Sequence, residues 1–370
     1  MTVYKFHDRL ALHHKGISSG LTIHVKVKDY IALCDQSFAQ AAQRMPIFEY
    51  LMQIAEVTFR LCFAGRALEP AIMPALAHLE NVNISGPIVT LNLWDMATTG
   101  VPIPRPPFAT DDYRRYGQRA VAYNDAISIM HAPTVPMLFA YNRDTQHGFF
   151  WTADAGKLSI YDRAAPLQTL LHWALSDFGW QIVHAAAVGS EQGGVLLIGN
   201  TGAGKSTTAL SCLTTKNDLR LLSDDKCLAR LDPSPQAFAA FSSGKIKADM
   251  LKHLPQFQDR LQGWDDSYKA GKGLVYLYPD YARHLIMTFA IKALVIPCVS
   301  HQKTATIRTI PAGEAFRVFG PSTVIWLPGA EADNYRFTAE LVRRLPCYQL
   351  DLALDPHRNT EEILNLLEKL

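Results

Sequence analysis

The second half of the chain contains short, mainly apolar runs that are followed by glycine or by acidic residues. Residues 194–198 form one such run, and the glycine at position 199 follows it directly. Residues 219–222 form another, which leads into the paired acids Asp224 and Asp225. Because short, mainly apolar runs of about four to eight residues are typical of buried strands, both are predicted to be strands with polar groups at their C-terminal ends.

The remainder of residues 151–370 alternates between helical and extended patterns, which predicts an α/β fold with mixed sheets. A helix is expected at 165–178, where apolar residues form one stripe and Pro166 lies near the first turn. Asn359 and Glu362 are spaced as a capping box for a final helix. The other expected helices are 206–213, 335–344 and 360–369, and the other expected strands are 181–188, 242–247, 290–298 and 348–354.

Residues 1–150 are predicted to form a separate domain of mixed α/β type, ahead of a second domain comprising residues 151–370. Alternation of apolar and polar residues at 21–27 indicates a half-buried strand. Residues 101–107 contain four prolines, which exclude a regular helix or a central strand. This half carries no recognisable chemistry, so partner recognition or an oligomer contact is the hypothesis for it. Helices are expected at 37–44 and 47–62, and strands at 87–93, 121–130 and 137–151, the last broken by a turn at 142–146.

The composition is that of an ordinary globular protein. Of the 370 residues, 48% are hydrophobic and 19% are charged, and the formal net charge is +2. A charge this small offers no general argument for binding nucleic acid or an anionic membrane. No apolar run approaches the roughly 20 residues that span a bilayer, and residues 1–15 lack the apolar core of a signal peptide. The six cysteines are far apart and include no C-x-x-C pair, so a reduced, cytoplasmic protein is expected.

The clearest chemical motif is the segment 199–206, which reads G-x-x-x-x-G-K-S. This pattern is typical of the loop that holds the phosphates of a bound nucleotide. Its glycines permit backbone conformations that turn successive N–H groups inward. Lys205 would reach the β- and γ-phosphates, and the Ser206 hydroxyl would ligate Mg²⁺. The predicted nucleotide-binding residues are Gly199, Asn200, Thr201, Gly202, Ala203, Gly204, Lys205, Ser206 and Thr207.

A single serine, Ser223, separates the mainly apolar run 219–222 from Asp224 and Asp225. Successive side chains of an extended strand point to opposite faces, so the two carboxylates cannot act at the same point. One would bind Mg²⁺, and the other would contact the acceptor hydroxyl, where a carboxylate can serve as a base. A solvated acidic turn is the alternative.

Further polar candidates lie on either side of this motif. His184 belongs to the expected strand 181–188, near the nucleotide end of the sheet, and a hydrogen-bonded core histidine is the alternative interpretation. Lys245 and Lys247 occupy alternate positions and would share one face of a strand. They would contact phosphates there, or else form a solvated basic edge. Lys272 is a weaker candidate of the same kind.

The order of these motifs resembles the kinase domain of HPr kinase/phosphorylase. The chain is more similar to the HPr-kinase-related serine kinases, some of which are found with lasso-peptide biosynthesis. The arginine-bearing E-V-R-G motif of true HPr kinase/phosphorylases is absent, which argues against HPr as the acceptor and against a phosphorylase reaction. The resemblance extends from about residue 151 to the C-terminus and includes segments 165–167, 184–189, 204–210, 321–323 and 345–350.

The resemblance implies a fold like that of phosphoenolpyruvate carboxykinase, with ATP and Mg²⁺ as cofactors. The acceptor would be a serine hydroxyl on a protein or peptide, such as a lasso-type precursor or HPr. Asp225 would be the general base, and Asp224 would assist it or lie near the metal. His184, Lys205 and Lys245 would complete the catalytic group. Related kinases form oligomers, so a homo-oligomer is compatible with the resemblance.

Two other functions fit the same sequence. One is a nucleotide-gated binding module that hydrolyses ATP slowly and delivers a peptide to other enzymes. The other is a kinase that acts on a small-molecule hydroxyl. Acceptor-dependent consumption of ATP separates the first from a kinase, and the sequence does not choose between ATP and GTP.

Overall fold

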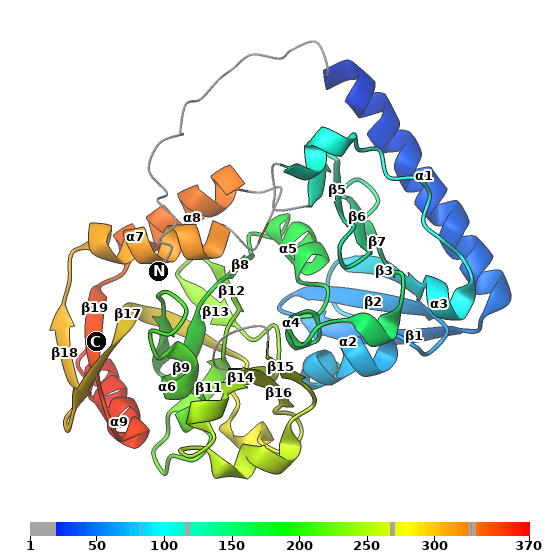
Figure 1. Ribbon diagram of the computed structural model, residues 1–370. Coiled ribbons are helices and arrows are strands. Elements are labelled where there is room, and N and C mark those ends of the chain that lie inside the picture. Colours follow the sequence, from blue (N-terminus) through cyan, green and yellow to red (C-terminus); the bar gives the residue numbers. More distant parts are fainter. Residues whose placement is uncertain (1–19, 82, 115–118, 267–270, 325–326, 328–330) are drawn as a thin grey trace.

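The computed structural model describes residues 20–81, 83–114, 119–266, 271–324, 327 and 331–370. Within these ranges the chain is of the mixed α/β class, with two large sheets and one small sheet (Figure 1). The predicted fold class is confirmed in this general form. No helix in these ranges is both long enough and apolar enough to cross a membrane. All six cysteines carry free thiols, and of these six only Cys298 is exposed.

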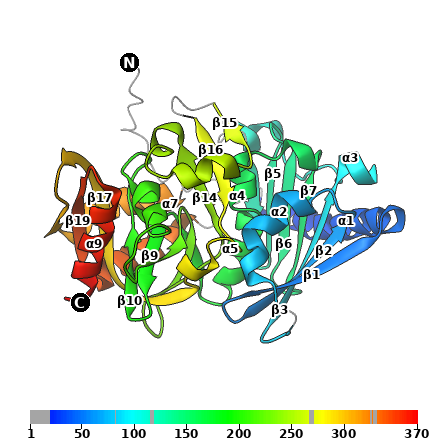
Figure 2. The same cartoon turned by 90° about the horizontal axis from the view of Figure 1, so that it is seen from below.

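The first sheet is built from the N-terminal half of the chain. Its strands are β1 (Ile47–Ile54), β2 (Val57–Ala64), β3 (Ile88–Asp95), β4 (Ala120–Tyr123), β5 (Ile127–Ala132), β6 (Met137–Asn142) and β7 (His147–Thr152), and the helices beside it are α1 (Gly20–Arg44), α2 (Glu69–Leu76), α3 (Met96–Thr99) and α5 (Gln168–Ser176). The strand order is β1-β2-β3-β7-β6-β5-β4. Helix α1 shares a core with one face, and α2 and α5 share a core with the other (Figure 2).

Two predictions for this region are wrong. Residues 21–27 begin helix α1 rather than a strand, because the buried residues that follow, Tyr30, Cys34 and Ala41, recur at helical spacing. Residues 47–62 form the antiparallel hairpin of β1 and β2 rather than a helix. Nearly every residue of β2 is buried, so its side chains lack the alternation that identifies a strand.

The other secondary-structure predictions for this region are confirmed. The helix expected at 37–44 is the end of α1, and the proline-rich residues 101–107 have no regular structure. The expected strand at 121–130 is divided into β4 and β5, because the Asn124 side chain accepts two backbone hydrogen bonds and forms a turn. Strands β3, β6 and β7 lie where the pattern predicts them.

The second sheet contains the glycine-rich segment. Its strands are β8 (Gln181–Val183), β9 (Ala186–Ser190), β10 (Gly193–Leu197), β11 (Arg220–Ser223), β12 (Cys227–Arg230), β13 (Gln236–Phe238), β17 (Thr288–Gln302), β18 (Thr306–Thr309) and β19 (Cys347–Ala353), and its helices are α6 (Lys205–Ser211), α7 (Ala312–Val324), α8 (Glu331–Arg344) and α9 (Pro356–Leu367). The strand order is β11-β9-β10-β17-β13-β12-β8, with β19 also paired to β17 and β18 to β19. Strands β10, β17 and β19 run parallel. Helices α6 and α9 pack on one face, and α7 and α8 pack on the other.

A three-stranded sheet packs against α6. Its strands are β14 (Ser243–Lys247), β15 (Trp264–Asp265) and β16 (Lys272–Tyr276), in the order β14-β16-β15. Gly244 permits this close approach, because a Cβ atom there would lie 2.9 Å from Cδ2 of Leu210 in α6. The opposite face carries Leu274, which packs against α4 (Ile160–Ala164).

Most elements predicted for the second half are present, and two details differ. The single strand expected at 181–188 is divided at His184, so that β8 pairs with β12 while β9 pairs with β10 and β11. The capping box predicted for the last helix is wrong. Asp355 caps the first turn of α9, whereas Asn359 lies inside the helix with its amide bonded to the backbone of Ala353.

The two halves of the chain share one interior. A single core cluster contains both Phe59 of the first sheet and Phe241, which comes shortly after strand β13 of the second sheet. At the same junction, Trp180 Nε1 donates to a Glu56 carboxylate oxygen at 3.0 Å. A truncation near residue 150 would therefore expose apolar surface on both sides.

Candidate functional site

The loop between β10 and α6 adopts a conformation that requires glycine. Gly199, Gly202 and Gly204 have φ angles of 143°, 92° and 102°, which residues with a Cβ atom rarely adopt. At Gly204 an added Cβ would also overlap Cδ1 of Leu352 in β19. Neither the backbone nor the space admits a side chain there, so the loop has the local shape that its sequence pattern predicts.

Lys205, the first residue of α6, is buried with its ammonium group against the loop. Its Nζ donates to the carbonyl oxygens of Gly199 and Asn200, at 2.6 and 3.3 Å. Burial lowers the pKa of this ammonium, and the nearby carboxylates of Asp225 and Asp224 oppose that shift. An anion at the loop would stabilise such a buried cation further.

The two acids lie in the bend between β11 and β12 rather than in a strand, and their surroundings differ. Asp224 is only 1% exposed, and its Oδ2 accepts a hydrogen bond from the backbone N–H of Lys245 at 2.9 Å. Its Oδ1 has no hydrogen-bond partner in the part of the chain that the structure describes. Burial raises the pKa of this carboxyl, whereas Lys245 and the Ser206 hydroxyl act to lower it. A buried carboxylate oxygen without a partner, close to a hydroxyl, offers suitable ligands for a hard divalent cation such as Mg²⁺.

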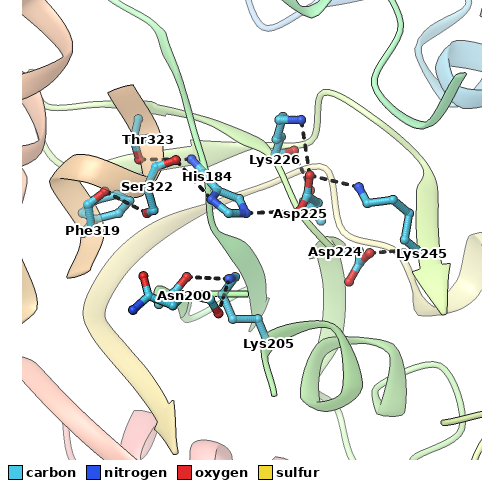
Figure 3. A network of polar contacts seen from close by, with 12 residues as sticks. His184, Asn200, Lys205, Asp224, Asp225, Lys226, Lys245, Phe319, Ser322 and Thr323 are labelled. Carbon is cyan, nitrogen blue, oxygen red and sulfur yellow. Dashed lines mark hydrogen bonds and ion pairs between the residues drawn. The ribbon is translucent and has the colours of Figure 1, made fainter. Parts of the chain in front are cut away.

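Asp225 contacts three basic side chains (Figure 3). Its Oδ2 lies 3.0 Å from Lys245 Nζ and 3.3 Å from Lys226 Nζ, and its Oδ1 lies 3.3 Å from His184 Nε2. Burial alone would raise the pKa of this carboxyl. Lys245, Lys226 and His184 outweigh that effect and hold the pKa well below its usual range. The side chain is 25% exposed and faces a cavity, so the carboxylate is accessible to a ligand.

His184 is held from two sides in the break between β8 and β9. Its Nδ1 lies 3.2 Å from the carbonyl oxygen of Ser322 in α7, and its backbone N–H donates to the Thr323 hydroxyl at 3.3 Å. A neutral imidazole donates through one nitrogen only, so the protonated ring alone can donate to both Ser322 and Asp225. The side chain lines the cavity, which places it in the cavity wall rather than in the apolar core.

Three lysines project from one face of the small sheet. Lys245 and Lys247 alternate along β14, and Lys247 is paired with Lys272 of β16. All three line the same cavity as the glycine-rich loop. Burial lowers the pKa of Lys272, and repulsion from Lys245 adds to that shift. The predicted common face of Lys245 and Lys247 is confirmed, and Lys272 shares it.

Most of these groups line a cavity of about 360 Å³, within the range of roughly 300–1,000 Å³ that is usual for ligand sites. Among the described residues, no group of three or more His, Cys, Asp or Glu side chains is placed to hold a metal ion. A cation here would depend on Asp224, Ser206 and oxygens of a ligand. Of the predicted site residues, 200–202, 204–207, His184, Asp225 and Lys245 line the cavity, whereas Gly199, Ala203 and Asp224 are not on its surface.

Lys226 is a member of this cluster that the sequence analysis missed. It is 8% exposed, and its Nζ pairs with Asp225 beside that of Lys245. Burial lowers the pKa of Lys226, and Asp225 opposes the shift. The sequence shows only that a lysine comes directly after two acids, and this order does not reveal which of the two acids the lysine contacts.

Comparison with known proteins adds no family assignment. No protein-family model matches the chain, and no curated protein matches it either. Function is therefore inferred from the geometry of the loop, the two acids and the cations around them.

Proposed function

We propose that this protein is a kinase that transfers the γ-phosphoryl group of ATP to a serine hydroxyl of a protein or peptide. The observation that carries the proposal is that Asp225, an ionised carboxylate, faces the same cavity as the glycine-rich loop and Lys205. The loop suits phosphates, and the carboxylate suits a hydroxyl donor. P-loop kinases of the HPr-kinase-related kind, with a fold like that of phosphoenolpyruvate carboxykinase, combine these two features.

In this proposal the loop and the cations around it hold the triphosphate. The backbone N–H groups of residues 199–206 and the Lys205 ammonium neutralise charge on the β- and γ-phosphates. Lys245 and Lys272 extend the positive surface along the small sheet toward the transferred group. Mg²⁺, when bound, would be held by Asp224 and Ser206 and would neutralise further phosphate charge.

Asp225 orients the acceptor and receives its proton late in the reaction. Its depressed pKa makes it a weak base but keeps it ionised at neutral pH. Phosphoryl transfer passes through a loose transition state in most analyses, so the hydroxyl need lose its proton only as the new O–P bond forms. The carboxylate accepts a hydrogen bond from the hydroxyl, directs its oxygen at the γ-phosphorus, and takes the proton as ADP departs. His184 and Lys226 hold the carboxylate in position.

The wider biological role follows the same proposal. A peptide or protein acceptor is favoured over nucleic acid or membrane, because the chain has a formal net charge of only +2. Residues 1–150 would recognise the acceptor or form a homo-oligomer contact, and the protein would act in the cytoplasm. The sequence resemblance suggests a lasso-type precursor peptide as the acceptor, or HPr despite the missing E-V-R-G motif.

Mass spectrometry of candidate acceptors, incubated with the full-length protein and Mg-ATP, tests this function. The panel contains HPr, precursor peptides that end in serine, and small hydroxyl compounds, and Lys205→Ala is the control. Gain of one phosphoryl group on a serine, with the wild-type protein only, supports the proposal. Transfer to a small compound alone would identify a small-molecule kinase instead. Tight nucleotide binding with slow hydrolysis and no transfer would favour the nucleotide-gated binding module.

A further inference from the structure

One end of the cavity is apolar and open to solvent. Val299 and Leu354 line it, yet 53% and 59% of their surfaces are exposed. Val299 lies near the C-terminal end of β17, and Leu354 comes directly after β19. The backbone N–H of Leu354 donates to the carbonyl of Gln302 at 2.9 Å, which fixes the two strand ends side by side. Pro356, at the start of α9, completes this apolar wall.

The topology places the apolar wall opposite the acids. In the sheet, β11, which the two aspartates follow, lies two strands from β10 on one side, and β19 lies two strands away on the other. The loop from β10 is therefore in the middle, and it touches β19 through Gly204 and Leu352. The C-terminal ends of β10, β17 and β19 meet at one edge, where ligands of parallel sheets bind. A triphosphate on the loop with its γ-phosphate toward Asp225 would have its remaining end directed at Val299 and Leu354.

We propose that the nucleobase lies against Val299, Leu354 and Pro356, and that the site accepts adenine and guanine about equally. This inference rests on the proposed function, since it assumes that the loop holds a nucleoside triphosphate. A nucleobase is the part of that ligand with flat apolar faces, which bury well against aliphatic side chains. Because this wall is continuous with the phosphate-binding loop, the base of the bound nucleotide is the group that would cover it.

Base selectivity needs polar side chains directed at the edge of the base. Asn359 is the buried amide on this wall, but its Oδ1 accepts from Ala353 N–H at 2.7 Å and its Nδ2 donates to the Ala353 carbonyl at 3.4 Å. Its amide is thus engaged in closing the turn between β19 and α9. The charged residues Asp249 and Lys252, which also line the cavity, are exposed, so their hydrogen bonds compete with water. Contact with the apolar wall therefore contributes more to base binding than recognition of the base edge does.

Calorimetric titration of the full-length protein with Mg²⁺ and ATP, GTP or inorganic tripolyphosphate tests this inference. ATP and GTP should bind with dissociation constants within about fivefold of each other, because apolar contact discriminates weakly. Tripolyphosphate should bind about tenfold more weakly than ATP, because it lacks the base. Leu354→Ser should weaken ATP binding about tenfold and leave tripolyphosphate binding unchanged. Leu33→Ser, at an exposed leucine of α1, is the matched control and should change neither.

The outcomes separate this inference from the proposed function. Equal binding of ATP and tripolyphosphate, or ATP binding that is indifferent to Leu354→Ser, would overturn the base site while leaving the phosphate loop in place. A preference of more than about a hundredfold for one purine would overturn the weak selectivity, since it requires recognition of the base edge. Failure of every triphosphate to bind, even to the wild type, would overturn both the base site and the kinase proposal.

Discussion

Replacing each of the two adjacent acids by asparagine should move the free energy of unfolding in opposite directions at pH 7. Asp225 has a folded pKa below its unfolded value of about 3.9, so its ionised form stabilises the protein above that pH. That stabilisation is lost only as the pH falls through the folded pKa. Asp224 has a raised folded pKa, so its ionisation costs stability as the pH rises above about 3.9.

The structure sets the expected magnitudes. Asp225→Asn leaves Lys226 and Lys245, each with 9% of its side chain exposed, without the carboxylate that they share. Breaking a buried ion pair costs about 3–5 kcal/mol, and the partial exposure of Asp225 reduces this to about 2–3 kcal/mol. Asp224→Asn retains an oxygen for the backbone N–H of Lys245 and removes the buried charge. Because ionisation of the buried carboxyl costs stability, Asp224→Asn is expected to be more stable than the wild type at pH 7.

Urea denaturation followed by circular dichroism, at pH 5 and pH 7.5, measures both effects. The gain for Asp224→Asn should be larger at pH 7.5 than at pH 5, because the carboxyl that it replaces is more fully ionised there. Both variants should lose at least a hundredfold in phosphoryl transfer, since removal of a catalytic carboxylate typically costs about 10²–10⁴. If the two substitutions destabilise the protein equally, the assignment of one acid to an ion-pair cluster and the other to a buried, unpaired position is refuted.

Three further predictions address the loop, the histidine and the last helix. Gly204→Ala should destabilise the protein by about 1–3 kcal/mol and abolish ATP binding in titration, because φ is positive and Leu352 occupies the space; an unchanged denaturation midpoint would contradict this. His184→Gln should move the acid limb of the rate–pH profile to higher pH, because one of the groups that lower the pKa of the catalytic carboxyl is lost, and an unmoved limb would argue against that contact. Asp355→Ala should cost about 1 kcal/mol in thermal unfolding as an N-cap, whereas Glu362→Ala should stay within about 0.5 kcal/mol; the reverse order would restore the capping box.

Local chemistry explains what was predictable from the sequence. The shape of the loop at 199–206 depends on glycines and on the strand and helix that adjoin it, all within a few residues of one another. The common face of Lys245 and Lys247 follows from the two-residue period of a strand. The different environments of Asp224 and Asp225 do not, because both residues lie in the bend between β11 and β12. The α/β class follows from alternation of the patterns along the chain.

Predictions failed where more than one local structure fits the same pattern. Residues 47–62 could be assigned to a helix because β2 is buried along nearly its whole length, and burial on both faces removes the strand alternation. The apolar–polar alternation at 21–27 lies within α1, whose later residues Tyr30, Cys34 and Ala41 are buried at helical spacing. Packing of α1 on the first sheet makes that choice, and the seven residues alone do not.

The sequence by itself determined the glycine-rich loop, the pair of acids and the candidate cations as separate features of the chain. Only the tertiary structure decided that His184, Lys226 and Lys245 meet on one carboxylate, Asp225. It also decided that the exposed apolar ends of β17 and β19 border the same cavity. The reason is physical: a residue's conformational preferences act over its near neighbours. Lys226 adjoins Asp225 in the chain, but the other contacts join segments tens of residues apart, and only the pairing of strands and the packing of helices bring them together.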